Sequence, residues 1–181
     1  MRPLFTVHAG EYLVGAHIEK AFKRVNVWVP VRDTGVDLLV SDELNRKTIS
    51  LQVKFSKDFL VTHKGPEFQK ELRACGWWTI NRDKLAKSPA DYWIFALQGF
   101  ASRSTDFVVV PPSGLLKRLD AIHGRQKLFQ VYLWATDRNT CWETRGLNRA
   151  QELQVAHGAF RDEARNLTQW LNNWQPIAAL K

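Results

Sequence analysis

The chain has few cysteines and no long apolar segment, and both absences narrow what it can be. Of its 181 residues only Cys75 and Cys141 are cysteines. They lie far apart without the paired spacing of metal ligands, so we interpret both as reduced, buried thiols. Nowhere do about 18 uninterrupted apolar residues occur, and no apolar run precedes Glu11. We therefore expect neither a signal peptide nor a membrane partner, and a cytoplasmic location.

Sequence repeats, low-complexity segments and histidine pairs with the spacing of zinc ligands are also missing. The remaining composition, with 45% hydrophobic and 24% charged residues, is typical of one globular domain with a core. Because no linker divides the chain, residues 1–181 are predicted to form a single domain.

Positive charge is in excess. Lys and Arg number 26 against 18 Asp and Glu, which gives a formal charge of +8 and a pI near 9.7. Neutralisation of phosphates by Lys and Arg supplies most sequence-independent affinity for nucleic acid. A polyanion is therefore the partner class that the composition favours.

Hydrophobic periodicity predicts the order helix, strand, strand, strand at the start of the chain. Apolar residues recur at helical spacing over 10–24, and they alternate with polar residues over 25–31. A short apolar strand is expected at 36–40, and a polar hairpin loop at 41–47 leads into a third strand at 48–56. This pattern places the second and third strands side by side.

The rest of the chain mixes helices and strands without strict alternation. Helices are predicted at 66–75, 82–87, 115–122 and 158–174, and strands at 91–97, 107–110 and 128–134. The fold class that we expect is α/β, in the sense of an α+β arrangement with a mixed sheet.

Polar residues interrupt the second and third predicted strands. Asp37 breaks an apolar run directly after a glycine turn, where a carboxylate without a partner would be costly to bury. On the third strand Gln52, Lys54 and Ser56 alternate with apolar residues and therefore share one face. If the two strands pair, Asp37 lies beside Gln52 and Lys54, which brings together an acid, an amide and an amine.

That combination suits metal-dependent hydrolysis. A carboxylate holds a hard divalent cation such as Mg²⁺ or Mn²⁺, and the cation polarises a phosphodiester and helps to generate hydroxide. Lys54 would orient the water or stabilise the charge that develops on the phosphate. Glu11, in the first turn of the preceding helix, could complete the metal ligands, and Gln52 can offer a neutral carbonyl oxygen.

Other interpretations of these residues stay open. Asp37 could cap the turn at Gly35 or pair with Arg32, and Lys54 could face solvent. Acids are favoured in the first turn of any helix, and Glu19 is a second helical candidate. The neighbouring Trp77 and Trp78 could stack on bases, but tryptophans more often pack in a core.

The polar residues resemble the signature of the PD-(D/E)XK nuclease superfamily, whose core is a helix followed by three strands, with an acid on one strand and acid-x-Lys on the next. Here the two segments read Gly35-Val36-Asp37 and Gln52-Val53-Lys54. Glutamine in place of the second acid is similar to the Q-x-K variant of the Mrr-like branch and of related uncharacterised bacterial families. Families of this kind often carry a glutamate on the first helix, and Gly10-Glu11 matches that position.

The resemblance implies a restriction-endonuclease-like αβββαβ core over residues 8–98, with a C-terminal helical extension over 99–181. It also implies a Mg²⁺- or Mn²⁺-dependent endonuclease or exonuclease that hydrolyses DNA, with Asp37, Glu11 and Gln52 as metal ligands and Lys54 as the residue that orients water. Lys57 and Lys64 flank the third strand and are candidates for phosphate contacts.

Two alternatives accompany this hypothesis. A nuclease fold without activity would bind nucleic acid or a protein partner, as the missing second acid suggests, and an unrelated basic domain would leave the polar strand faces in solvent. A homodimer is a further expectation, because many nucleases cut both strands as dimers. Trp170 and Trp174 on the C-terminal apolar helix are candidates for its interface.

Overall fold

The computed structural model describes residues 9–32, 34–60, 64–100 and 104–180. It is a mixed α+β protein built on a five-stranded mixed sheet, sheet A, and a three-stranded antiparallel sheet, sheet B. The strands are β1 (Val25–Trp28), β2 (Leu38–Asp42), β3 (Thr48–Lys57), β4 (Leu72–Asn81), β5 (Tyr92–Gln98), β6 (Thr105–Val110), β7 (Leu128–Thr136) and β8 (Cys141–Glu143). The helices are α1 (Ala9–Ala21), α3 (Pro66–Gln69), α4 (Arg82–Ala86), α5 (Pro112–His123), α6 (Arg149–His157), the 3₁₀ helix η1 (Thr168–Trp170) and α7 (Gln175–Ala178).

Sheet A has the strand order β1-β2-β3-β5-β6. Strands β2 and β3 pair antiparallel, as the sequence predicts, β1 pairs antiparallel with β2, and β5 lies parallel to β3. Strand β2 pairs only with residues 48–51 of β3, so residues 52–57 continue past it. Beyond Leu51, β2 no longer pairs with β3. The candidate site lies along this edge of β3.

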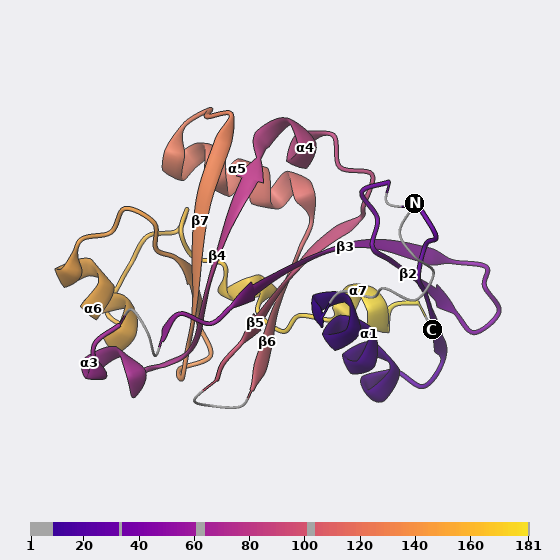
Figure 1. Ribbon diagram of the computed structural model, residues 1–181, viewed down its shortest axis with the longest axis horizontal. Coiled ribbons are helices and arrows are strands. Elements are labelled where there is room, and N and C mark those ends of the chain that lie inside the picture. The colour runs from indigo at the N-terminus through magenta and orange to yellow at the C-terminus, as the bar shows by residue number, and fades with distance from the viewer. Residues whose placement is uncertain (1–8, 33, 61–63, 101–103, 181) are drawn as a thin grey trace.

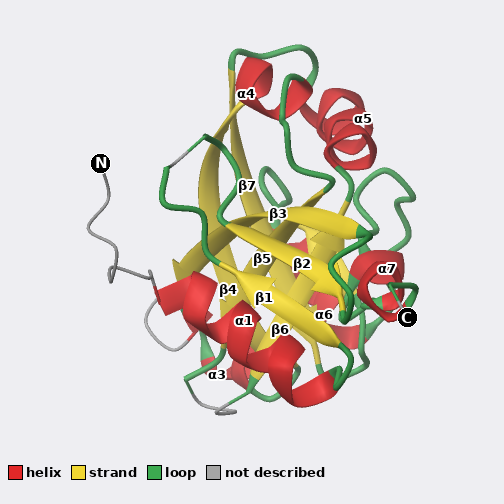
Figure 2. Ribbon diagram, turned by 90° about the vertical axis from the view of Figure 1, so that its right-hand side faces the viewer, coloured by secondary structure: helices red, strands yellow, loops and turns green. Residues whose placement is uncertain are grey.

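Sheet B consists of β4, β7 and β8, and Figure 1 shows β4 and β7 side by side. One face of sheet B packs against sheet A, where large side chains such as Trp78, Phe95 and Phe129 form a common core. The opposite face of sheet A packs on α1 and α7, and Figure 2 shows α1 lying across its strands. The two sheets thus share one core. Helices α1 and α7 pack on the other face of sheet A, and α3 and α6 pack on the other face of sheet B.

The expected helix at 66–75 is wrong over most of its length. Helix α3 ends at Gln69, and residues from Leu72 onward form β4. Proline at the start of a helix and the following charges favour the helix locally. The strand forms because Ala74, Cys75 and Trp78 are buried, from opposite faces of β4, against two different clusters. Tertiary packing outweighs local propensity here.

The expected helix at 158–174 and the C-terminal helical extension are also wrong. The helix lies earlier, in α6, where Asn148 and Gln151 form a capping box and Gly158 ends it with φ of 77°. The C-terminal half also supplies β6, β7 and β8. Trp174, a candidate for a dimer interface on that helix, instead packs against His17 and Phe107 in the core; Trp170 packs partly buried against the core.

Among the described residues, no helix has both the length and the apolar character that a membrane span needs. Cys75 and Cys141 are free, buried thiols, as expected from the sequence. Burial raises the pKa of both thiols well above its ordinary value.

We expect neither cysteine to react with a thiol reagent in the folded protein. The reactive species is the thiolate, and at pH 8 a raised pKa leaves almost none of it. Titration with DTNB should therefore detect no thiol in the native chain and two after denaturation. Rapid native labelling of either cysteine would contradict the packing described.

A buried ion pair ties sheet B to sheet A. The guanidinium of Arg73 on β4 donates to both oxygens of Asp106 on β6, at 2.9 and 2.8 Å. Asn172 donates to the same carboxylate at 2.8 Å. Because Asp106 is buried, removal of its cation would leave a charge with too few partners.

Arg73→Met is expected to lower the free energy of unfolding by about 3 kcal/mol. The exposed pair of Arg149 and Glu67 provides the control, because Arg149→Met should cost less than about 1 kcal/mol. Urea unfolding followed by circular dichroism measures both variants. Equal losses in the two variants would show that the buried pair does not join the sheets energetically.

Candidate functional site

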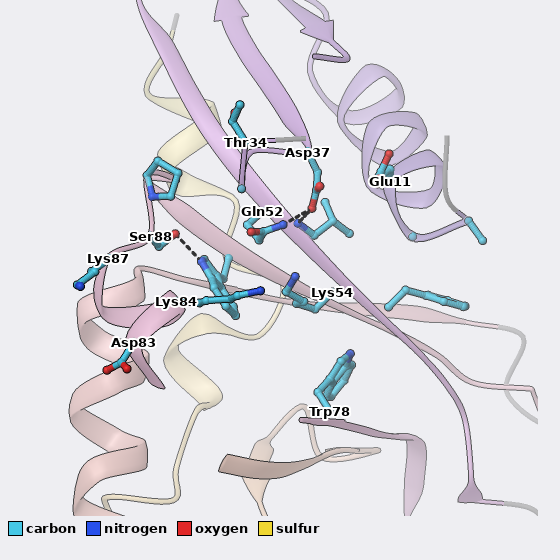
Figure 3. Close-up of a pocket in the computed structure, with 17 residues that line it drawn as sticks. Glu11, Thr34, Asp37, Gln52, Lys54, Trp78, Asp83, Lys84, Lys87 and Ser88 are labelled. Atoms are coloured by element: carbon cyan, nitrogen blue, oxygen red, sulfur yellow. Dashed lines mark hydrogen bonds between the residues drawn. The ribbon is translucent and has the colours of Figure 1, made fainter. Parts of the chain in front are cut away.

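The site begins where β2 leaves β3. The backbone N–H of Asp37 donates to the carbonyl of Leu51 at 2.8 Å. The Asp37 carboxylate then accepts the backbone N–H of Val53 at 2.8 Å and the Gln52 amide at 2.6 Å (Figure 3). A side-chain oxygen thus takes the place of the next strand carbonyl, which explains how a carboxylate that is only 5% exposed is tolerated among apolar neighbours.

The turn before Asp37 depends on a glycine. Gly35 has φ of 87°, a conformation that other residues rarely adopt. A Cβ atom there would also lie 3.3 Å from Pro89, in the loop that follows α4. Gly35 therefore lets the β2 turn and the Pro89 loop approach each other closely, and it sets the point at which Asp37 enters the strand.

Lys54 is the second charged group on β3 and lies on the same face as Gln52. Its Nζ lies 5.1 Å from the ring centroid of Trp93 on β5. The indole of Trp93 is in turn fixed by donation from Nε1 to the Ser88 hydroxyl at 2.8 Å. This cation–π contact positions the ammonium beside the Trp93 ring.

Glu11 approaches from the other side of β3. It lies in the first turn of α1 and is 4% exposed. A Cβ atom on Gly10 would lie 2.6 Å from Cβ of Phe55, so only glycine allows α1 to come this close to β3. The close approach makes Glu11 part of the lining of the cavity that Asp37 also lines (Figure 3).

A cavity of about 1070 Å³ joins these groups. Its walls include all four residues that the sequence analysis placed in the metal site and the water-orienting role, namely Glu11, Asp37, Gln52 and Lys54. The structure thus brings together side chains from α1, from the residue before β2 and from β3. The Asp37 carboxylate accepts hydrogen bonds from Gln52 and Val53, both on β3.

The opposite wall was missed by the sequence analysis. Lys84 and Lys87 of the α4 region line the cavity, and Figure 3 shows Lys84 extending toward β3 while Lys87 points away from Asp37. Trp78 adds a buried indole Nε1 that has no acceptor among the described residues. The amphipathic pattern of residues 82–87 predicts the helix. No pattern close in sequence predicts that β4 brings this helix to the cavity.

Helix α4 is held firmly although it is short. The Asn81 side chain caps it by accepting the Lys84 N–H at 3.0 Å. Arg82 forms two hydrogen bonds to Asp120 of α5, at 2.9 and 2.7 Å. These bonds lower the pKa of Asp120 below its usual value and raise that of Arg82. The pair is therefore charged at neutral pH and anchors the helix that carries Lys84.

The two flanking lysines predicted to contact phosphate have different outcomes. The side chain of Lys57 lies outside the described residues. Lys64 contacts Glu152 at 2.8 Å and lies 4.5 Å from the ring centroid of Trp134, away from the cavity. Lys64 is therefore not part of the cavity lining, and its contact with phosphate stays a prediction. Glu19, the second helical acid, is exposed and outside the cavity lining.

The donor atoms at the cavity fit a hard divalent cation. Two carboxylates, of Asp37 and Glu11, and the amide oxygen of Gln52 offer oxygen only, which Mg²⁺ and Mn²⁺ prefer. Among the described residues no group of three or more His, Cys, Asp or Glu side chains gathers. Mg²⁺ commonly binds through one or two carboxylates and keeps several waters, so this set is sufficient for it.

Comparisons with family models, curated proteins and solved structures found no significant match to this chain. A function for this chain must therefore be inferred from the geometry of the cavity.

The contact between Gln52 and Asp37 predicts how Gln52→Glu behaves. A second carboxylate beside Asp37 repels the first, so at pH 8 in EDTA we expect the variant to melt about 5 °C below wild type. The deficit should shrink at pH 5, where the two carboxyls can share a proton. Millimolar Mg²⁺ should raise the Tm of the variant more than that of wild type, because it neutralises the added charge.

Differential scanning fluorimetry measures these shifts. Gln154→Glu on the exposed part of α6 is the matched control, and its Tm should respond to neither pH nor Mg²⁺ differently from wild type. A Gln52→Glu variant that melts like this control in EDTA would show that residue 52 does not face Asp37 closely.

Proposed function

We propose that this protein is a metal-dependent nuclease that hydrolyses phosphodiester bonds of DNA, with a core of the PD-(D/E)XK type. The order of α1, β1, β2 and β3, followed by β5 parallel to β3, supports that core. The crossover from β3 to β5 departs from a simple αβββαβ pattern, because it includes β4 of the second sheet.

One observation carries the proposal. Asp37, Gln52 and Lys54 meet at the edge of β3 that β2 has left, and they line one cavity with Glu11. Structural needs explain the Val53 N–H bond to Asp37, but they do not explain why a second buried acid and two lysines converge on the same space. Groups of both charges around one cavity are expected where a metal ion and a phosphate bind together.

In this proposal Asp37 and Glu11 would hold Mg²⁺ or Mn²⁺, and the Gln52 carbonyl oxygen would join them when the amide, which here donates to Asp37, turns over. The bound cation supplies Lewis acidity and lowers the pKa of bound water. The Lys54 ammonium orients the attacking water and stabilises the negative charge that gathers on the phosphate oxygens as the P–O bond breaks. Lys84 binds the neighbouring phosphate from the opposite wall. Addition of water yields a phosphate monoester and a free hydroxyl group.

The charge of the whole chain favours the same substrate. A net charge of +8 attracts the polyanionic backbone at long range and makes binding sensitive to salt. The alternative is an inactive protein of the same fold that binds nucleic acid or a protein partner without cutting. Such a protein would carry the same charge, so binding alone does not distinguish it from a nuclease.

Cleavage of supercoiled and linear plasmid with Mg²⁺ or Mn²⁺ tests the proposal. We expect wild-type protein to cut in a metal-dependent manner, and Asp37→Asn and Lys54→Ala each to reduce the rate by at least about 100-fold, because each removes a group that acts on the reacting phosphate. Rates from gel densitometry at several enzyme concentrations provide the measurement.

Matched variants exclude a contaminating nuclease. Asp42→Asn changes the aspartate at the end of β2, which accepts hydrogen bonds from the backbone N–H groups of Arg46 and Lys47 outside the cavity. Lys117→Ala removes an exposed lysine of α5. Both should cut like wild type. If the wild type never cuts, or cuts no faster than the Asp37 and Lys54 variants, the catalytic proposal fails and salt-dependent binding becomes the function to examine.

A further inference from the structure

Two neighbouring tryptophans on β4 point to opposite sides of sheet B. Trp78 is 7% exposed and forms part of the cavity wall, with its ring edge-on to Phe95. Trp77 is 53% exposed on the outer face of the sheet. Packing in the core therefore accounts for the tryptophan at position 78. Trp77 is largely outside the core, so burial does not account for a large aromatic side chain there.

Further aromatic and basic groups surround Trp77. Tyr132 of β7 lies directly opposite it in the antiparallel register. The guanidinium of Arg145 lies 5.3 Å from the Tyr132 ring centroid, and the ring of Phe59 lies 6.0 Å from it. We call Trp77, Tyr132, Phe59 and Arg145 the aromatic platform.

The chemistry of the surrounding face is neutral or basic. Next to the platform the outward positions of β4 and β7 hold Thr79, Leu128 and Gln130, none of them acidic. Helices α3 and α6 cover the other end of this face, over Cys75 and Trp134, and leave the platform end open. An anionic partner thus meets no acid on these strands.

The platform and the candidate site both adjoin the end of β3. The backbone N–H of Trp77 donates to the hydroxyl of Ser56 at 3.1 Å, which holds β4 against β3. Phe55, the residue before Ser56, lines the cavity and is itself partly exposed. The residues next to Ser56 thus connect the cavity lining to the strand that carries Trp77.

We propose that the aromatic platform stacks the bases of a single-stranded segment of nucleic acid, and that the substrate of this protein has such a segment beside the bond that is cut. Unpaired bases expose flat faces that stack on aromatic rings, and an arginine supplies charge for the backbone. Paired bases in a duplex hide those faces. The substrate inference rests on the proposed function, whereas stacking on the platform can be tested without cleavage.

Binding measured in EDTA, where no metal-dependent cleavage takes place, tests stacking on the platform separately from the nuclease proposal. Fluorescence anisotropy with a labelled oligothymidylate of 20 nucleotides and with a duplex of 20 base pairs gives Kd for each. We expect Trp77→Ala and Tyr132→Ala each to weaken single-strand binding about tenfold or more, and to change duplex binding less than twofold. Trp77→Phe should retain most of the affinity, because it keeps an aromatic face.

Trp28→Ala is the matched control, since Trp28 is 51% exposed but lies on β1 at the far edge of sheet A. It should bind the single strand like wild type, and circular dichroism should show that all variants are folded. The proposal is overturned if wild type does not bind the single strand, if the platform variants bind it normally, or if Trp28→Ala weakens it equally.

These outcomes are independent of the cleavage test. If Trp77→Ala binds the single strand normally and the protein cuts DNA in a manner that requires metal and Asp37, the platform proposal is wrong and the nuclease proposal stands. Weakened binding by Trp77→Ala in a protein that cuts no plasmid, no single strand and no duplex with a single-stranded tail would remove the nuclease. It would leave a protein that holds single-stranded nucleic acid.

Discussion

The hydrogen bond from the Val53 N–H to the Asp37 carboxylate is the contact on which the rest of the site depends. An antiparallel strand pair can separate only if the backbone groups that it exposes find other partners. Asp37 supplies that partner at the first position past the separation. Strand β3 can then continue alone along one edge, and the space beside it becomes the cavity. A charge that would be costly elsewhere is here required by the backbone.

Local patterns were sufficient to predict this part of the molecule. Helical periodicity locates α1, and alternation locates β1 and β3. The shared face of Gln52 and Lys54 follows from the two-residue period of a strand alone. Pairing with β2 then brings Asp37 to them through a loop of a few residues. Each step uses contacts that are close in sequence, and for that reason the sequence reveals them.

The second sheet could not be predicted in the same way. Residues of β4 pair with residues of β7 that lie 47 to 64 positions later in the chain. The apolar residues of β4 pack into clusters on both of its faces, which removes the alternation that marks a half-buried strand. Lys84 comes to the cavity only because that strand forms. In the segment 158–174 a local pattern predicts a helix that does not form. Phe160 and Leu167 have helical spacing there, but they pack into two separate clusters of the core.

Both signs of charge line the cavity. Glu11 of α1 and Asp37, just before β2, bring carboxylates, Lys54 of β3 brings an ammonium group, and the α4 region brings Asp83 together with Lys84 and Lys87. In the proposed function Glu11 and Asp37 would hold the metal ion, and Lys54 and Lys84 would face the oxygens of the phosphate. Near its end β3 also contacts β4, where the Ser56 hydroxyl accepts the backbone N–H of Trp77. The separation of β2 from β3 therefore fixes the position of the cavity, and the same stretch of β3 fixes the position of the proposed aromatic platform relative to it.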